Sequence, residues 1–179
     1  MRRYPILISF LLFILYCPRS EAKFNYTFLK DIVHSDFYQS LNLHSSEWLD
    51  SIIMLPNDDF DQLAAKQMIQ RIDQLPQELL QKISAQRIVV VLFNGKLTDF
   101  PSTNHLSGLI PRGYRNTGTT WDDVPGSGGN RIVHVKIGAS DYGKGHSSVN
   151  LELHELAHSI DKLIFNKIRE NAYFLSYWG

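Results

Sequence analysis

The segment NLELHELAHSID, Asn150–Asp161, decides the fold because two side-chain patterns share one helical repeat there. On a wheel of about 100° per residue, His154, His158 and Asp161 fall within about 60° of one another. A separate side of the wheel carries the apolar positions Leu153, Leu156, Ile160, Leu163 and Ile164. The pattern therefore predicts a final helix over residues 148–166, with one face packed and the other pointing into a cleft.

The polar face of this helix carries the pattern H-E-x-x-H. His154 and His158 lie one helical turn apart, so both imidazoles can bind one zinc ion at nitrogen–zinc distances of about 2.0–2.1 Å. Glu155 projects toward the place where a zinc-activated water would stand, and its carboxylate can take a proton from that water. The pattern predicts a zinc site with Glu155 as general base. The alternative is a solvated helix face that carries the pattern by chance.

The segments before this helix predict a helical layer followed by strands. Residues 23–84 show mainly helical spacing, with Asn57 or Asp58 as the cap of one helix and Pro76 at the start of another. Residues 87–94, RIVVVLFN, form a β-branched run that is typical of a buried strand.

A second strand is predicted over residues 131–138, RIVHVKIG, because Val133 and Val135 alternate with polar positions. An extended peptide could pair with this strand as an edge. His134 and His146 are interpreted as polar surface residues, since an isolated histidine in a strand or turn seldom binds a metal.

Residues 96–130 form a long stretch rich in Gly, Pro, Thr and Asn, and a loop of this length is usually functional. Tyr114 and Trp121 are candidates either for lining a substrate groove or for covering the core. Gly126–Gly129 lacks the Lys-Ser/Thr ending of a phosphate-binding loop and is interpreted as a flexible turn beside the cleft.

The first residues predict export from the cell. Arg2 and Arg3 precede the apolar run Ile6–Tyr16, and Ser20–Ala22 supplies the small residues of a cleavage site. Residues 1–22 are therefore predicted to be a signal peptide. The apolar run is shorter than the roughly 20 residues of a membrane-spanning helix, so no stable membrane anchor is expected.

Composition predicts a single globular domain over residues 23–179. The chain has 179 residues, of which 44% are hydrophobic, a size sufficient for one buried core. Basic and acidic residues number 18 each, without long runs of one sign, which argues against a nucleic-acid partner. Cys17 is the single cysteine and lies in the predicted signal peptide, so the secreted protein would lack disulfides.

Three segments carry a family resemblance: TWDDVPGSGG (residues 120–129), VHVKIG (133–138) and GKGHSSVNLELHELAHSID (143–161). Together they resemble the anthrax lethal factor-like metallopeptidase domains of exported bacterial proteins, which are related to the secreted Pro-Pro endopeptidases. The resemblance implies an α+β, zincin-like fold with N-terminal helices, a small mixed sheet and then the active-site helix. It also implies zinc ligation by His154 and His158 and a general base in Glu155.

The chain departs from that family in its third zinc ligand. The family places a glutamate, preceded by an oxyanion-stabilising tyrosine, several tens of residues after the second histidine. Here the downstream glutamate is Glu170, which is closer to His158 than that spacing. The sequence favours a C-terminally truncated member; the alternative is a third ligand from Asp161, Glu170 or another molecule. Asp161 can also orient His158 or bond to solvent or a lysine.

The predicted function is a secreted zinc metalloendopeptidase acting on protein or peptide substrates, with the activity of this truncated chain left open. One alternative is a non-catalytic exported binding module on a degenerate zincin fold. Another is a zinc hydrolase whose substrates are not peptides.

Overall fold

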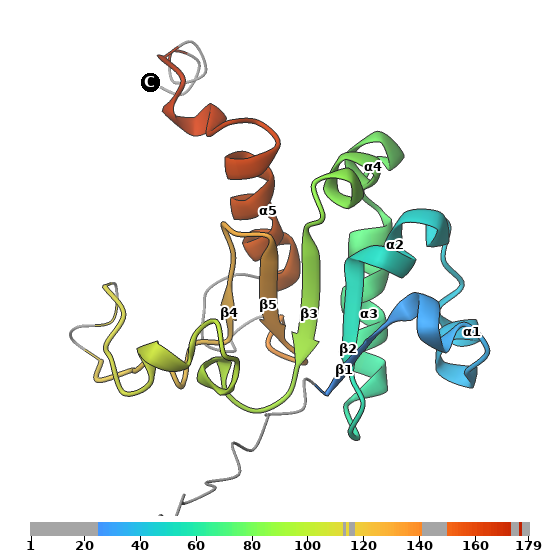
Figure 1. Ribbon diagram of the computed structural model, residues 1–179, viewed down its shortest axis with the longest axis horizontal. Helices are drawn as coiled ribbons and strands as arrows, with labels where there is room; N and C mark the ends of the chain where they lie inside the picture. The colour runs from blue at the N-terminus through green and yellow to red at the C-terminus, as the bar shows by residue number, and fades with distance from the viewer. Residues whose placement is uncertain (1–24, 113, 115–116, 141–149, 173–175, 177–179) are drawn as a thin grey trace, which may run out of the picture.

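The computed structural model describes residues 25–112, 114, 117–140, 150–172 and 176 (Figure 1). The predicted signal peptide and His146 lie outside these residues. Among the described residues, no helix combines the length and apolarity needed to cross a bilayer.

A five-stranded mixed sheet organises the chain, in the order β1-β2-β3-β5-β4. The central strands β2, β3 and β5 are parallel, whereas β1 and β4 pair antiparallel at the two edges. The strands are β1 (Tyr26–Phe28), β2 (Ile53–Pro56), β3 (Val89–Phe93), β4 (Gly126–Ser127) and β5 (Ile132–Lys136).

Five α-helices and four short 3-10 helices connect these strands in the described chain. The α-helices are α1 (Asp36–Leu41), α2 (Ser46–Ile52), α3 (Gln62–Asp73), α4 (Gln77–Ala85) and α5 (Leu151–Leu163). The 3-10 helices are η1 (Leu29–Ile32), η2 (Leu97–Asp99), η3 (Asn104–Leu106) and η4 (Ile168–Glu170). This order confirms the predicted α+β layout, with helices preceding the sheet's centre and the motif helix following it.

Two sequence expectations for the first half are wrong. The cap of α3 is Asp61, whose side chain accepts a hydrogen bond from the Ala64 amide at 3.0 Å, and neither Asn57 nor Asp58 fills that position. Residues 23–84 were also expected to be mainly helical, but they contain the strand β2. This strand follows α2 without a polar break and is buried at every position, so its residues continue the apolar pattern of the helix.

The edge strand next to the motif helix is β4, and the expectation that residues 131–138 supply this edge is wrong. β5 lies inside the sheet, parallel to β3 on one side and antiparallel to β4 on the other. The short β4 falls in the glycine-rich stretch, where a two-residue strand leaves no alternating pattern to read.

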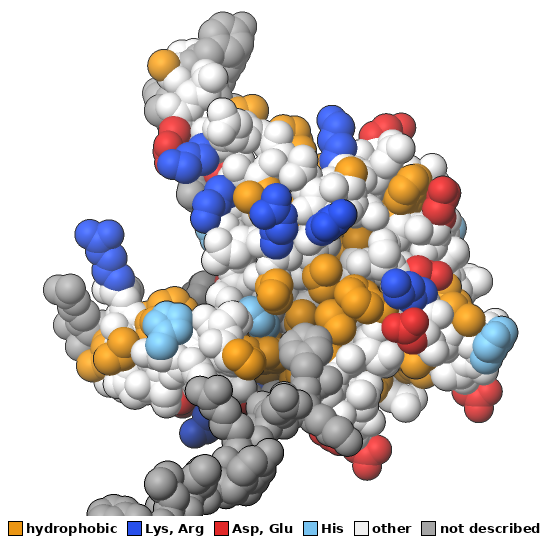
Figure 2. Space-filling model, in the orientation of Figure 1, with side chains coloured by type: hydrophobic (Ala, Val, Ile, Leu, Met, Phe, Trp, Pro, Cys, Tyr) orange, Lys and Arg blue, Asp and Glu red, His pale blue; other side chains and the backbone are white. Residues whose placement is uncertain are grey.

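Each face of the sheet is buried by a different part of the chain. On one face, Val90 and Leu92 of β3 join the main core that the α-helices complete. On the other face, Val91 and Phe93 join a second cluster whose remaining buried members are Met54, Leu97, Phe100 and Val124. Figure 2 views this second face: hydrophobic side chains gather over the middle, with Lys and Arg side chains above them.

His134 is buried in β5, so its interpretation as a surface residue is wrong. Its side of the strand faces the second cluster, where its ring lies 4.4 Å from the ring of Phe100, and 3% of the residue is exposed. Its Nδ1 lies 3.4 Å from the Ser127 hydroxyl. Burial lowers the pKa of His134 to about 4, since the charged imidazolium loses its hydration there.

An ion pair between the partly exposed Arg71 and the buried Glu152 fixes the start of α5 to α3. Glu152 has no exposed side-chain surface, and its carboxylate accepts hydrogen bonds from Arg71 of α3 and from the Ser140 hydroxyl. Two partners therefore satisfy a charge that would otherwise be costly to bury. The contact holds the motif helix two residues before its first histidine.

Removal of one partner from this pair is expected to be strongly destabilising. Arg71→Ala leaves the buried Glu152 carboxylate without its counter-charge, so the free energy of unfolding should fall by about 3–5 kcal/mol. Denaturant titration measures this loss. Glu170→Ala is the matched control, because its pair with Lys167 is exposed and should contribute below about 1 kcal/mol. Equal losses in the two variants would contradict a dominant role for the Arg71–Glu152 pair.

The buried His134 should make stability depend on pH. The pKa of His134 is about 4 in the folded chain and 6.5 in the unfolded chain. As the pH falls, the unfolded chain is therefore protonated at this residue before the native chain is. As far as this group is concerned, the free energy of unfolding is highest above about pH 7. It falls by about 2 kcal/mol between pH 7 and pH 5 as His134 is protonated in the unfolded chain. His134→Asn keeps a polar partner for Ser127 and should lose this portion of the pH dependence in denaturant titrations. An unchanged slope would refute the assignment.

Candidate metal centre

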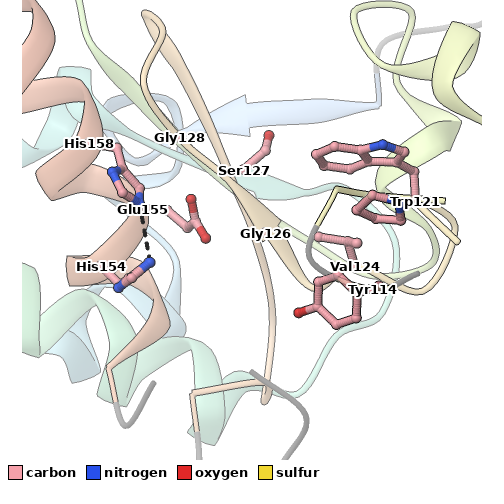
Figure 3. A pocket seen from close by; sticks show the side chains of 10 residues that line it. Tyr114, Trp121, Val124, Gly126, Ser127, Gly128, His154, Glu155 and His158 are labelled. Atoms are coloured by element: carbon pink, nitrogen blue, oxygen red, sulfur yellow. Dashed lines mark hydrogen bonds between the residues drawn. The ribbon is translucent and has the colours of Figure 1, made fainter. Parts of the chain in front are cut away.

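The two motif histidines project from α5 to the same place. Their ring centroids lie 4.8 Å apart with the ring planes perpendicular, and Nε2 of His154 is 3.2 Å from Nε2 of His158 (Figure 3). His154 is exposed and His158 is half-buried. Four-residue spacing on a regular helix produces this convergence, as the sequence predicts.

The separation of the two nitrogens fits a shared zinc ion. Two nitrogens at about 2.0–2.1 Å from a tetrahedral zinc lie about 3.3 Å from each other. The observed 3.2 Å therefore allows both Nε2 atoms to bind one ion without rearrangement of the helix. The same distance suits a hydrogen bond between two neutral rings, in which the tautomers decide the donor.

Glu155 lies in the same space with its carboxylate beside His158. Figure 3 shows this side chain extending from α5 toward β4. The residue is 5% exposed, although it follows the exposed His154 directly. The arrangement places an acceptor of protons next to the pair of nitrogens that could hold a metal.

Glycines let the edge strand approach the motif helix at Glu155. A Cβ on Gly128 would lie 2.0 Å from the carbonyl oxygen of Glu155, and one on Gly126 would lie 3.0 Å from its Cγ. No side chain can occupy position 128 without moving the helix or the strand. The predicted flexible turn is therefore a packed strand and loop, set against α5.

Ser159 adds a polar connection between the same two segments. Its hydroxyl accepts a hydrogen bond from the Gly129 amide at 2.9 Å and donates one to the Asn130 carbonyl at 2.7 Å. Ser159 is fully buried. The residue that follows the second histidine thus fixes the loop between β4 and β5 to the helix, a role that no sequence pattern indicated.

The side chains of the H-E-x-x-H motif open into a pocket of about 260 Å³. His154, Glu155 and His158 form one side, and Gly126, Ser127 and Gly128 lie next to them. The opposite wall comes from the segment before β4: Pro111, Tyr114, Trp121 and Val124. Tyr114 and Trp121 both line the pocket. Trp121 also packs against the second cluster, so it covers part of the core as one of the two expectations had it.

The other candidate ligands do not complete the centre in the described part of the chain. Glu170 forms an exposed pair with Lys167, with 3.2 Å between its Oε2 and the lysine Nζ. Asp161 lies half-buried on α5, in the turn after His158. Among the described residues, no group of three or more His, Cys, Asp or Glu side chains is arranged to hold a metal.

Comparisons with known proteins identify relatives of this arrangement. The family described as "Anthrax toxin lethal factor, N- and C-terminal domain" matches residues 40–179. A Pro-Pro endopeptidase of Paenibacillus alvei is 38% identical over 128 residues, which cover 72% of this chain and 58% of that protein. A Pro-Pro endopeptidase of Clostridioides difficile is 38% identical over 130 residues, covering 73% and 59%. The chain thus spans less than two thirds of the length of these relatives.

A solved structure confirms the fold assignment. The structure of the Pro-Pro endopeptidase PPEP-2 from Paenibacillus alvei superposes with a TM-score of 0.67 at 38% sequence identity, covering 72% of this chain and 69% of that one. The predicted zincin-like α+β fold is confirmed by this similarity. The chain therefore belongs to the anthrax toxin lethal factor family, in the group that contains the Pro-Pro endopeptidases.

Proposed function

We propose that this chain is the zinc-binding part of a secreted metalloendopeptidase that cleaves proline-containing peptides. One observation carries the proposal. The Nε2 atoms of His154 and His158 are 3.2 Å apart, and the Glu155 carboxylate shares their pocket. Export rests on the predicted signal peptide at residues 1–22, and the preference for proline rests on the names of the relatives.

The chemistry follows from the side chains that meet in the pocket. A zinc ion held by His154 and His158 would polarise the scissile carbonyl and acidify a water molecule. Glu155 would accept a proton from the attacking water and deliver it to the leaving amine. Its low exposure keeps the carboxylate among protein atoms, where its direction is set by packing against Gly126.

The edge of the sheet offers a place for an extended substrate. β4 ends the strand order and has β5 on one side, so a peptide could pair along its other side. This pairing would carry the peptide backbone past Glu155, because β4 packs on α5 at that residue. The strand that we expect to pair with a substrate is therefore β4 and not β5.

The wall opposite α5 suits proline side chains. Pro111, Tyr114, Trp121 and Val124 present apolar and aromatic surface to the pocket. Flat aromatic surfaces bind proline rings well, and proline-rich peptides are already extended before binding, which lowers the entropy lost on association. The wall therefore supports a proline-containing substrate.

A second candidate is a non-catalytic binding module on the same fold. It is favoured by the ligand count, since a catalytic zinc normally has three protein ligands and the described residues supply two histidines. In this candidate the edge strand and the apolar wall bind a peptide without cleaving it.

Zinc binding should depend on His158. His158→Ala removes one of two converging nitrogens, so the zinc affinity should fall by about tenfold or more. Competition titration with a chelating dye measures this change. His105→Ala is the matched control, because His105 is exposed in η3 and lies outside the pocket. Equal zinc affinity in His158→Ala and the unmodified protein would remove the metal site.

Peptide cleavage should depend on Glu155 separately from the metal. Glu155→Gln preserves the side-chain volume and both histidines, so zinc binding should persist while cleavage slows by about 10²- to 10⁴-fold. Mass spectrometry of a library of proline-containing peptides measures the products. Glu47→Gln, an exposed change on α2, is the control. Equal cleavage by Glu155→Gln and the unmodified protein would contradict the general-base role. If both proteins bind zinc and neither cleaves a peptide, the result favours the binding module.

A further inference from the structure

The apolar wall of the pocket belongs to a segment with little regular structure. Between the end of β3 and the start of β4, the described chain contains only the short helices η2 and η3. Yet this segment must hold Trp121 and Val124 opposite α5 for the pocket to exist. Some other interaction has to fix it in place.

Asp122 gathers hydrogen bonds that join distant parts of this segment. Its Oδ1 accepts from the hydroxyls of Thr98 at 2.5 Å and Ser107 at 3.0 Å. Its Oδ2 accepts from the Gly108 amide at 2.7 Å and the Thr120 hydroxyl at 3.2 Å. The four donors come from the beginning, the middle and the end of the segment, so one carboxylate joins all three parts.

An ionised carboxylate is the group that this arrangement requires. It accepts hydrogen bonds at both oxygens, whereas an amide would turn an NH₂ group toward two of the donors. Bonds from the Thr98 hydroxyl and the Gly108 amide are the largest causes that hold the pKa of Asp122 well below its usual range. Asp122 is therefore ionised at neutral pH.

The carboxylate is connected directly to the pocket wall. Trp121 precedes Asp122, its amide donates to the Leu109 carbonyl at 2.9 Å, and its side chain packs against the second cluster. Val124 is buried in that cluster two residues later. A displacement of Asp122 would therefore move both wall residues relative to α5.

We propose that Asp122 is a positioning residue that sets the distance between the Trp121 wall and the motif helix, and thereby the affinity of the pocket for a peptide. The part concerning peptides rests on the proposed function. Asp122 does not line the pocket itself and acts through its neighbours.

The adjacent Asp123 provides a matched control. Its Oδ2 accepts from the Thr120 amide at 3.2 Å and lies 3.1 Å from the Thr120 hydroxyl, whose single proton it shares with Asp122. Both of these bonds stay within one turn. Asp123→Asn removes the same charge one residue away, without breaking a bond to Thr98, Ser107 or Gly108. A general effect of lost charge would appear in both variants, whereas loss of positioning would appear only in Asp122→Asn.

The first measurement does not depend on catalysis. Trp48→Phe with Trp178→Phe leaves Trp121 as the sole tryptophan, and acrylamide quenching then reports how accessible its ring is. In this background Asp122→Asn should raise the quenching constant about twofold or more, as expected when a restrained segment opens locally, and Asp123→Asn should leave it near the starting value. Unchanged quenching in Asp122→Asn overturns the proposal.

The second measurement separates positioning from chemistry. With a proline-containing peptide, Asp122→Asn should raise KM about tenfold and leave kcat within about twofold, because the wall contacts the substrate and not the reacting atoms. A loss in kcat at unchanged KM overturns the proposal. If the unmodified protein cleaves no peptide, the proposed function fails while the quenching result still decides whether Asp122 positions the wall.

A milder variant keeps the test available if Asp122→Asn does not fold. Thr98→Val removes a single donor to the carboxylate and keeps the side-chain shape. It should change the quenching of Trp121 and the KM in the same direction by a smaller factor. No change in either quantity contradicts the proposal.

Discussion

Between Gly128 and the backbone of Glu155 there is no room for a side chain, and the whole site is arranged around that contact. It sets how far the edge strand β4 stands from α5. It also buries Glu155, although the preceding residue of the helix, His154, is exposed. Ser159 reinforces the contact with two hydrogen bonds to the following loop. The cleft therefore has one side whose geometry is fixed by main-chain atoms.

The two faces of the sheet support different parts of the site. The face covered by α-helices holds the motif helix, whose buried Glu152 pairs in its first turn with the partly exposed Arg71 of α3. The opposite face supports the pocket wall through a smaller apolar cluster that includes Phe100 and Val124. Because β3 and β5 alternate their side chains between the faces, the same strands support both sides of the cleft. His134 is neutral within the second cluster, where an imidazolium would be costly.

The sequence predicted those features whose pattern is local. α5 and β5 have clear periodicity, and β3 is a continuous apolar run of largely β-branched residues. The spacing of His154 and His158 places their rings together on any regular helix. β4 could not be predicted in this way, because its two residues leave no alternating pattern and its Gly126 meets Glu155, a residue 29 positions later in the chain. The hydrogen bonds of Asp122 likewise join residues that no short window contains. β2 was missed because it follows α2 directly, so its apolar residues continue the pattern of the helix.

The contact at Gly128 is made with the carbonyl group of Glu155 and not with its carboxylate. The close approach at Gly128 therefore depends on the backbone at position 155, whereas the side chain there meets Gly126 through its Cγ. In the proposed function, the backbone of Glu155 sets the shape of the groove, and its carboxylate would supply the general base. During divergence, a descendant could exchange its reactive group and still inherit the groove, so that new chemistry or mere recognition could arise without rebuilding the fold.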